Sequence, residues 1–165
     1  MTRTAGSVRV AQSALSWGFV ANIVFQGPAA LTLDSKGRIA MPARHRELLS
    51  AMGVSQLTIT KHPEGSLMIF PRPAWEAFRD RVASLPMEAS GWKRVFLGNA
   101  MDVDIDASSR VLIAPELRAS AGLVRDVMLL GMGSHFELWD AQRHADHEAA
   151  VMQSQMPESL KQFSF

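Results

Sequence analysis

The chain has 165 residues, of which 47% are hydrophobic and 20% charged, a composition typical of one globular domain or of two small halves with a shared core. It contains no cysteine, which excludes disulfides, thiolate zinc sites and cysteine nucleophiles. The net charge is only +1, so a chain of this composition that binds a polyanion must concentrate its positive charge locally.

The N-terminal segment, residues 1–23, differs in character from the rest of the chain. Two arginines precede an apolar stretch at residues 14–25, a pattern that secretory signal peptides share. The stretch is too short to cross a bilayer as a helix, and the QGPAA that follows is a poor cleavage site. We therefore favour a non-native N-terminal extension over a signal peptide.

From residue 24 onward the chain is a tandem duplication. Asp34, Arg38 and Arg46 recur 72 residues later as Asp106, Arg110 and Arg118, and the apolar positions around them keep the same offset. Four short strands in one copy cannot bury a two-sided core, so we expect the copies to pack together in a pseudo-twofold, β-rich body. The predicted parts are a first repeat, a connecting helix, a second repeat and a tail, at residues 24–86, 87–98, 99–152 and 153–165.

The first copy opens with an alternating strand at residues 31–33 and an Asp-x-x-Gly turn that ends at Gly37. Pro42 fits the first position of a helix, and Gly53 lies just past its end. Two strands joined by a turn and a closing helix complete this copy, at residues 57–60, 67–70 and 73–85.

A connecting helix is predicted at residues 88–97, and the second copy then repeats the order of the first. Pro115 and Gly122 bracket its short helix as the equivalent residues do in the first copy. The remaining strands and the last helix are predicted at residues 103–105, 111–113, 127–130, 136–139 and 140–152.

Positive charge gathers around the first turn. Four cations and one anion between Asp34 and Arg46 give a local charge of +3; the cations are Lys36, Arg38, Arg44 and Arg46. The planar fork of arginine can bind a phosphate or a guanine edge, and a β-turn is narrow enough to enter the major groove of DNA. A solvated basic turn is the alternative on charge alone. In the second copy the turn itself is uncharged, so the alternative that the Asp106–Arg110 pair only stabilises this turn remains open.

Catalytic motifs are absent from the sequence, which lacks a glycine-rich phosphate loop, a nucleophile elbow and a zincin helix. His144 and His147 can share one helical face and hold a metal, but a solvated polar helix is the favoured interpretation. We predict no enzyme, no cofactor and no small-molecule substrate. Six aromatic side chains at apolar positions are expected to pack in the core: Trp75, Phe78, Trp92, Phe96, Phe136 and Trp139.

Four long segments resemble the MraZ family of bacterial DNA-binding regulators: FQGPAALTLDSKGRIAMPARHRELL, TKHPEGSLMIFPRPAWEAF, FLGNAMDVDIDASSRVLIAPELRASAGL and GMGSHFELWD. The resemblance implies a β-rich α+β protein with two tandem AbrB-like (double-split or swapped-hairpin β-barrel) halves. It also implies ring-shaped homo-oligomers that bind double-stranded DNA at TGGG-type direct repeats upstream of their own operon, in the division and cell-wall gene cluster. Such proteins are usually repressors associated with the nucleoid in the cytoplasm, without a cofactor or membrane partner.

Carried over by position, the family's Asp-x-x-x-Arg signature falls on Asp34 and Arg38 and again on Asp106 and Arg110. The resemblance places the DNA-contacting residues on the first turn, chiefly Arg38 with Lys36 beside it. The second copy departs from the pattern, because Ser109 and Ala114 replace a common glycine and a common proline; we expect a less sharply bent turn there.

The resemblance begins just before Phe25, so we expect translation to start at Val24 and residues 1–23 to be extra. An alternative function is that of an antitoxin-like partner protein of the AbrB/MazE fold. In that case the C-terminal segment, residues 152–165, would be the tail that neutralises a toxin.

Overall fold

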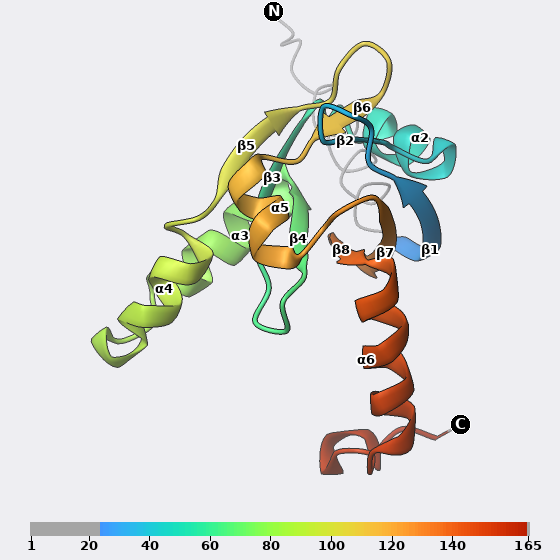
Figure 1. Ribbon diagram of the computed structural model, residues 1–165. Helices are drawn as coiled ribbons and strands as arrows, with labels where there is room; N and C mark the ends of the chain where they lie inside the picture. Colours follow the sequence, from blue (N-terminus) through green and yellow to red (C-terminus); the bar gives the residue numbers. More distant parts are fainter. Residues whose placement is uncertain (1–23, 165) are drawn as a thin grey trace, which may run out of the picture.

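The structure is a computed structural model that describes residues 24–164, and the expectations for residues 1–23 lie outside this part of the chain. The described residues form a β-rich body with eight strands, five α-helices and two 3-10 helices (Figure 1). The strands are β1 (Phe25–Thr32), β2 (Arg38–Ala40), β3 (Gln56–Lys61), β4 (Leu67–Pro71), β5 (Met101–Asp104), β6 (Arg110–Leu112), β7 (Asp126–Gly133) and β8 (Phe136–Asp140). The helices are α2 (Ala43–Ala51), α3 (Arg72–Ala83), η1 (Met87–Ala89), α4 (Ser90–Phe96), α5 (Pro115–Ala121), α6 (Ala141–Gln153) and η2 (Glu158–Leu160).

The two repeats exchange strands instead of folding side by side. The large antiparallel sheet has the order β1-β7-β8-β4-β3-β5, so the first strand of each repeat pairs with the third strand of the other. The second strands, β2 and β6, form a separate two-stranded ladder. The expected single body built from both copies is therefore confirmed, and its two-repeat, β-rich form is consistent with AbrB-like halves.

The strand register shows the pseudo-twofold relation directly. Leu31 pairs with Val127, and the equivalent Val103 of the second repeat pairs with Leu57. Ile39 of β2 lies opposite its own counterpart, Val111 of β6. A one-residue slip in any ladder would turn its apolar side chains toward solvent, so burial fixes this register.

The core lies between the large sheet, the β2–β6 ladder and the helices α2 and α5. Ile39 and Val111 at the centre of the small ladder are fully buried. Strand β1 alternates buried and exposed positions because one of its faces meets the core, whereas every residue of the central strand β4 is buried. Each fully buried Leu or Ile stabilises the fold by about 1.5–3 kcal/mol relative to an exposed one.

Most predicted elements are confirmed within about three residues at each end, and three details differ. The first strand begins at Phe25, well before residue 31, because its pairing with β7 continues to Gly133. Pro42 precedes α2 with extended backbone (φ −56°, ψ 144°) and is not its first helical residue. Trp92 was expected in the core but is 50% exposed, because only one side of α4 packs on the body.

Two helical arms leave the body in different directions, one containing α3 and α4 and the other α6 (Figure 1). The first arm covers a second apolar cluster built on Met68, Phe70 and Trp75. The second arm has no buried residue along α6. Among the helices of residues 24–164, none has the length and apolar character needed to cross a membrane.

Candidate nucleic-acid interface

One carboxylate organises the first turn (residues 34–38). Asp34 Oδ1 accepts hydrogen bonds from the backbone N–H groups of Lys36 and Arg38, both at 2.9 Å, and Oδ2 accepts one from Arg38 Nε at 2.7 Å. The backbone hydrogen bond from Arg38 is the main cause that holds the pKa of Asp34 below its ordinary value of 3.8. The Arg38 guanidinium is thus fixed at Nε, and its side chain remains 23% exposed.

The second turn (residues 106–110) has the same hydrogen bonds. Asp106 Oδ1 accepts from the N–H groups of Ser108 and Arg110 at 2.8 and 2.9 Å, and Oδ2 accepts from Arg110 Nε at 3.0 Å. The backbone hydrogen bond from Arg110 is again the main cause that lowers the pKa of Asp106.

The expectation of a less sharply bent second turn is wrong. Ser109 has φ +60°, close to the φ of +78° at Gly37, and it is the only non-glycine residue with positive φ in the described part of the chain. Ala114 has the same φ and ψ, −56° and 144°, as Pro42. Serine and alanine therefore adopt the conformation that glycine and proline favour, and Ser109 does so at a cost of about 1–2 kcal/mol.

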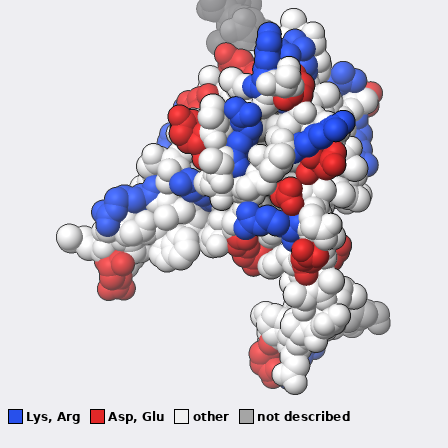
Figure 2. All heavy atoms as spheres, in the orientation of Figure 1, with Lys and Arg blue, Asp and Glu red and all other residues white. Residues whose placement is uncertain are grey.

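Strand exchange brings the two turns together at one end of the molecule. The N–H of Met41 donates to the carbonyl of Ser109, and the N–H of Ile113 donates to the carbonyl of Gly37, each at 2.9 Å. These bonds extend the β2–β6 ladder, in which Arg110 lies opposite Ala40. Figure 2 shows Lys and Arg side chains gathered at this end, with carboxylates among them.

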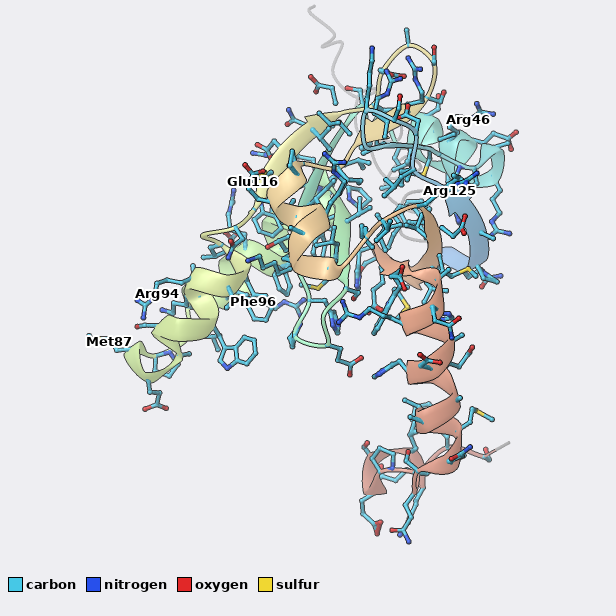
Figure 3. The ribbon with its side chains drawn as sticks, viewed as in Figure 1. Arg46, Met87, Arg94, Phe96, Glu116 and Arg125 are labelled. Atoms are coloured by element: carbon cyan, nitrogen blue, oxygen red, sulfur yellow. The ribbon has the colours of Figure 1, made fainter. Side chains whose placement is uncertain are left out.

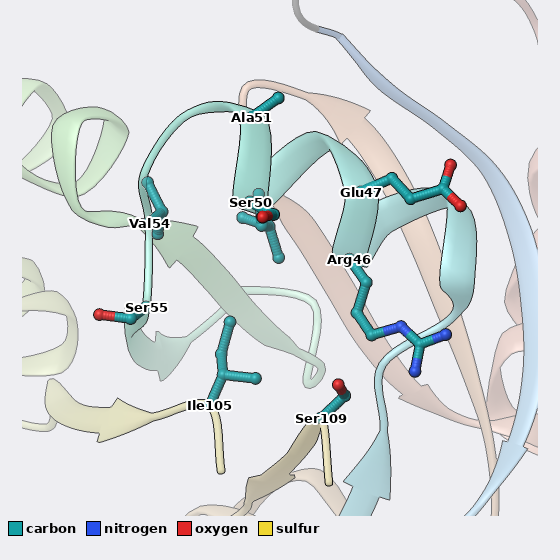
Figure 4. A pocket seen from close by; sticks show the side chains of 9 residues that line it. Arg46, Glu47, Ser50, Ala51, Val54, Ser55, Ile105 and Ser109 are labelled. Carbon is teal, nitrogen blue, oxygen red and sulfur yellow. The ribbon is translucent and has the colours of Figure 1, made fainter. Parts of the chain in front are cut away.

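Three of the four predicted basic residues lie at this end of the molecule, and the fourth, Arg44, points toward β1. Lys36 is exposed on the first turn beside Arg38. Arg46 projects from α2 toward Ser109 across a hollow of about 700 Å³ (Figure 4). Arg44 instead donates from Nη2 to the Pro28 carbonyl at 2.7 Å, so this guanidinium holds α2 against β1.

Arg118 is a member of this group that the charge count around the first turn missed. A Cβ added to Gly37 would lie 2.5 Å from Arg118 Cζ, so this guanidinium lies directly on the first turn. Its Nε is buried without a hydrogen-bond partner. The signal was present in the sequence, because Arg118 is the repeat counterpart of Arg46. The contact was not predictable, however, because only the exchange of strands between the repeats places the helix of one repeat on the turn of the other.

The histidine pair on α6 lies beside Trp139, and His147 also contacts Glu64. No group of three or more His, Cys, Asp or Glu side chains in residues 24–164 has the arrangement of a metal centre. His147 Nε2 lies 2.9 Å from Glu64 Oε2, and its ring stacks on Trp139 with the centroids 4.9 Å apart. Both contacts fix the helix to the body.

These features define a class: a duplicated β-rich protein whose halves exchange strands and present two matched Asp–Arg turns at one basic end. The family model of MraZ, an antitoxin-like protein, matches residues 24–93 and 96–162, one match for each repeat. The chain belongs to the MraZ family.

Relatives agree with this assignment over almost their whole length. A protein of Methylibium petroleiphilum is 70% identical over 146 residues, and one of Leptothrix cholodnii is 66% identical over 146 residues; each match covers 88% of this chain and all of the relative. A protein of Ralstonia pickettii is 61% identical over 142 residues, which is 86% of this chain and all of the relative. All three are named transcriptional regulator MraZ. The relatives of this family are thus named as regulators of transcription.

Proposed function

We propose that the chain regulates transcription by binding double-stranded DNA through its first turn, as a ring-shaped homo-oligomer without a cofactor. Its targets are TGGG-type direct repeats upstream of its own operon in the division and cell-wall gene cluster, and occupying them represses the promoter. The protein would act on the nucleoid. The observation that supports the proposal most directly is the rigid, cationic first turn, in which Asp34 presents Arg38 beside Lys36.

Arg38 is the residue that would read the sequence. Its hydrogen bond to Asp34 uses Nε, and its terminal amino groups make no hydrogen bond within residues 24–164. Those groups can donate to O6 and N7 of a guanine, which is worth about 1–3 kcal/mol of discrimination per good pair. Because the side chain is already ordered, binding loses less conformational entropy than it would with a free arginine.

The other cations would supply charge without sequence selection. Lys36 on the first turn and Arg46 beside Ser109 of the adjoining second turn can meet phosphates. The second turn carries Ser108 where the first carries Lys36, so it offers less charge. We assign it a supporting role, in which its ladder bonds hold the first turn in place.

One turn contacts few phosphates, so a single subunit would bind weakly and lose affinity quickly with salt. A ring presents several first turns in a fixed array. Once one turn has bound a repeat, the next contact becomes intramolecular, which can strengthen binding by about 10²–10⁴-fold without any new kind of contact.

The test compares Arg38→Ala with Arg110→Ala, which removes the equivalent hydrogen bond from the second turn. Both exposed pairs contribute only about 0–1 kcal/mol to stability, so both variants should fold and assemble. Fluorescence anisotropy with upstream DNA that carries intact or G-scrambled repeats should show binding lost in Arg38→Ala and retained in Arg110→Ala. Equal affinity of wild type and Arg38→Ala would contradict the proposal.

A further inference from the structure

The first turn is held in place by one segment of the second repeat, residues 113–125, which we call the support segment. At its beginning, the N–H of Ile113 donates to the Gly37 carbonyl at 2.9 Å. At its end, the Arg125 carbonyl accepts from the N–H of Leu33, also at 2.9 Å. Figure 3 shows Arg125 past the end of α5, where the chain turns toward β7. The helix α5 lies between these two bonds, so its position affects the first turn from both sides.

The side chain of Arg118 adds a third contact between α5 and the first turn. A Cβ added to Gly37 would lie 2.5 Å from Arg118 Cζ, and Arg118 Nε is buried without a hydrogen-bond partner among the described residues. Because no bond at Nε fixes this guanidinium, it takes its position from the packing of α5. A shift of α5 would therefore move it relative to the turn.

One side chain of α6 holds the end of α5. Arg143 Nη1 donates to the Ala121 carbonyl, in the last turn of α5, at 2.8 Å. The same guanidinium lies against two glycines with positive φ: an added Cβ would be 2.6 Å from Arg143 Nη2 at Gly65 and 3.0 Å from Nη1 at Gly122. The last carbonyls of a helix lack partners within it and carry partial negative charge, so a cationic donor suits this position. Arg143 thus fastens the end of α5 to α6, beside the turn between β3 and β4.

The beginning of α6 is a firm support for this contact. Asp140 caps the helix, because its Oδ2 accepts a hydrogen bond from the N–H of Arg143 at 3.0 Å. About one helical turn later, the His147 ring stacks on Trp139 of β8 with the centroids 4.9 Å apart. Both contacts fix the part of α6 from which the guanidinium of Arg143 projects.

The described residues give the second turn no equivalent clamp. Its backbone support is the same, since the Ser55 carbonyl accepts from the N–H of Ile105 at 2.9 Å. Gly53 at the end of α2, however, has no described atom within 4 Å of an added Cβ. Helix α3 carries Ala74 where α6 carries Arg143, and a methyl group cannot reach α2 to hold its end. The clamp is therefore built only on the side of the basic first turn.

We propose that Arg143 is a positioning residue for DNA binding. By fastening the end of α5, it holds the Arg118 guanidinium and the first turn in the arrangement in which Arg38 reaches the bases. The guanidinium of Arg143 is engaged by the Ala121 carbonyl, so it acts through α5 and not on a phosphate. This inference rests on the proposed function and assigns the order of the DNA-binding turn to a residue of the last helix.

Hydrogen exchange measured by mass spectrometry tests the positioning in the absence of DNA. Residues 33–38 and 105–110 are equivalent segments that contain the first and the second turn, so each molecule contains its own reference. In Arg143→Ala the first segment should exchange about 2- to 30-fold faster than in wild type, and the second should keep its wild-type rate. Equal acceleration of both segments would show a general loosening of the fold. That result, or no acceleration of either segment, would overturn the inference.

Fluorescence anisotropy with the upstream DNA gives the functional readout. Arg143→Ala should bind about 2- to 30-fold more weakly with an unchanged salt slope, because no phosphate contact is lost. Arg72→Ala is the charge-matched control, since it removes one arginine from the counterpart helix α3, where Arg72 Nε lies 3.1 Å from Glu76 Oε1. This control should bind as the wild type does. Equal losses in the two variants, or a salt slope reduced by about one in Arg143→Ala, would attribute the effect to charge and contradict the inference.

A double-mutant cycle separates positioning from a general structural role. If Arg143 acts through Arg118, then Arg143→Ala should change the affinity by less than about twofold in the Arg118→Ala background. Losses that simply add in the double variant would exclude this route. Should Arg143→Ala fail to fold, Arg143→Gln, which keeps most of the aliphatic stem, is measured in its place with the same expectations.

Failure of this inference and failure of the proposed function give different results. If Arg38→Ala binds the upstream DNA as the wild type does, the proposed function fails, and the role of Arg143 in DNA binding fails with it. If Arg38→Ala loses binding while Arg143→Ala keeps the wild-type affinity, the proposed function stands and only the inference about Arg143 is wrong.

Discussion

The two turns allow the cost of a left-handed residue to be measured by opposite substitutions in one molecule. Gly37 and Ser109 occupy equivalent positions with φ of +78° and +60°. Replacing Ser109 by Gly relieves strain in the second turn, whereas replacing Gly37 by Ser introduces strain into the first. Ser109→Gly is therefore expected to stabilise the protein and Gly37→Ser to destabilise it.

The magnitudes follow from the backbone and from what surrounds each site. A non-glycine residue in the left-handed region costs about 1–2 kcal/mol, but glycine gains more freedom on unfolding, worth about 0.5–1 kcal/mol in the opposite direction. The free energy of unfolding should thus rise by about 0.5–1 kcal/mol in Ser109→Gly. Gly37→Ser should lower it by about 1–2 kcal/mol, because its Cβ would also lie 2.5 Å from Arg118 Cζ and displace that guanidinium.

Thermal unfolding at one fixed protein concentration is the assay, since the proposed self-association would raise the apparent Tm. For a chain of this size about 1 kcal/mol moves Tm by about 2–4 °C, so Ser109→Gly should melt about 1–4 °C higher than wild type. Ser108→Gly is the control: its φ is not positive, so it should melt lower. A lower Tm for Ser109→Gly, or equal shifts for Ser109→Gly and Ser108→Gly, would refute the reasoning.

Three further outcomes test the site and its surroundings. Burial, followed by the charge of Arg44, lowers the pKa of His45, so wild-type stability should fall as pH drops below 6.5 and level off below the lowered pKa. His45→Leu introduces the residue type found at the equivalent position of the second repeat, Leu117. Urea titrations across this pH range should show that this variant loses less of its free energy of unfolding than wild type does. Because hydrogen bonding lowers the pKa of Asp34, its carboxylate stabilises the folded protein fully above pH 3.8, and this stabilisation is lost as the pH falls through the lowered pKa. In Asp34→Asn, circular dichroism should therefore show a smaller loss of stability on acidification than in wild type. Arg118→Ala should weaken DNA binding with an unchanged salt slope, because Arg118 positions the first turn; a slope reduced by about one would instead place a phosphate on it.

Local patterns were enough to predict the elements of the fold but not their partners. Alternating burial along β1 and the Asp-x-x-Gly turn follow from residue types and spacing. Strand pairing depends on contacts far apart in the sequence, and periodicity is equally satisfied by two independent halves. The exchange of β1 and β5 between repeats was therefore not predictable from the pattern, although the expectation of a shared core was.

The same limit explains which site residues were predicted. Lys36 and Arg38 were predicted because their charge is concentrated on one local turn, which the structure keeps exposed. Arg118 was missed because it reaches the first turn only through the exchange. Arg44 was included by charge although its guanidinium turns back to the Pro28 carbonyl, a bond that depends on how α2 packs on β1. Trp92 was assigned to the core because a helical apolar position does not reveal which side of its helix is covered.

The differences between the repeats fall on surfaces, whereas the ladders that join them are nearly symmetric. The first turn has Lys36 where the second has Ser108, and one arm is sealed by α4 where the other is open. A symmetric duplication would favour contacts through identical patches, which place two binding turns in opposite orientations and suit inverted sites. A head-to-tail contact between different patches of neighbouring subunits instead repeats each first turn in the same orientation from one subunit to the next. That geometry would suit the direct repeats proposed as operator sites, and the divergence of the two repeats supplies the different patches that such a contact needs.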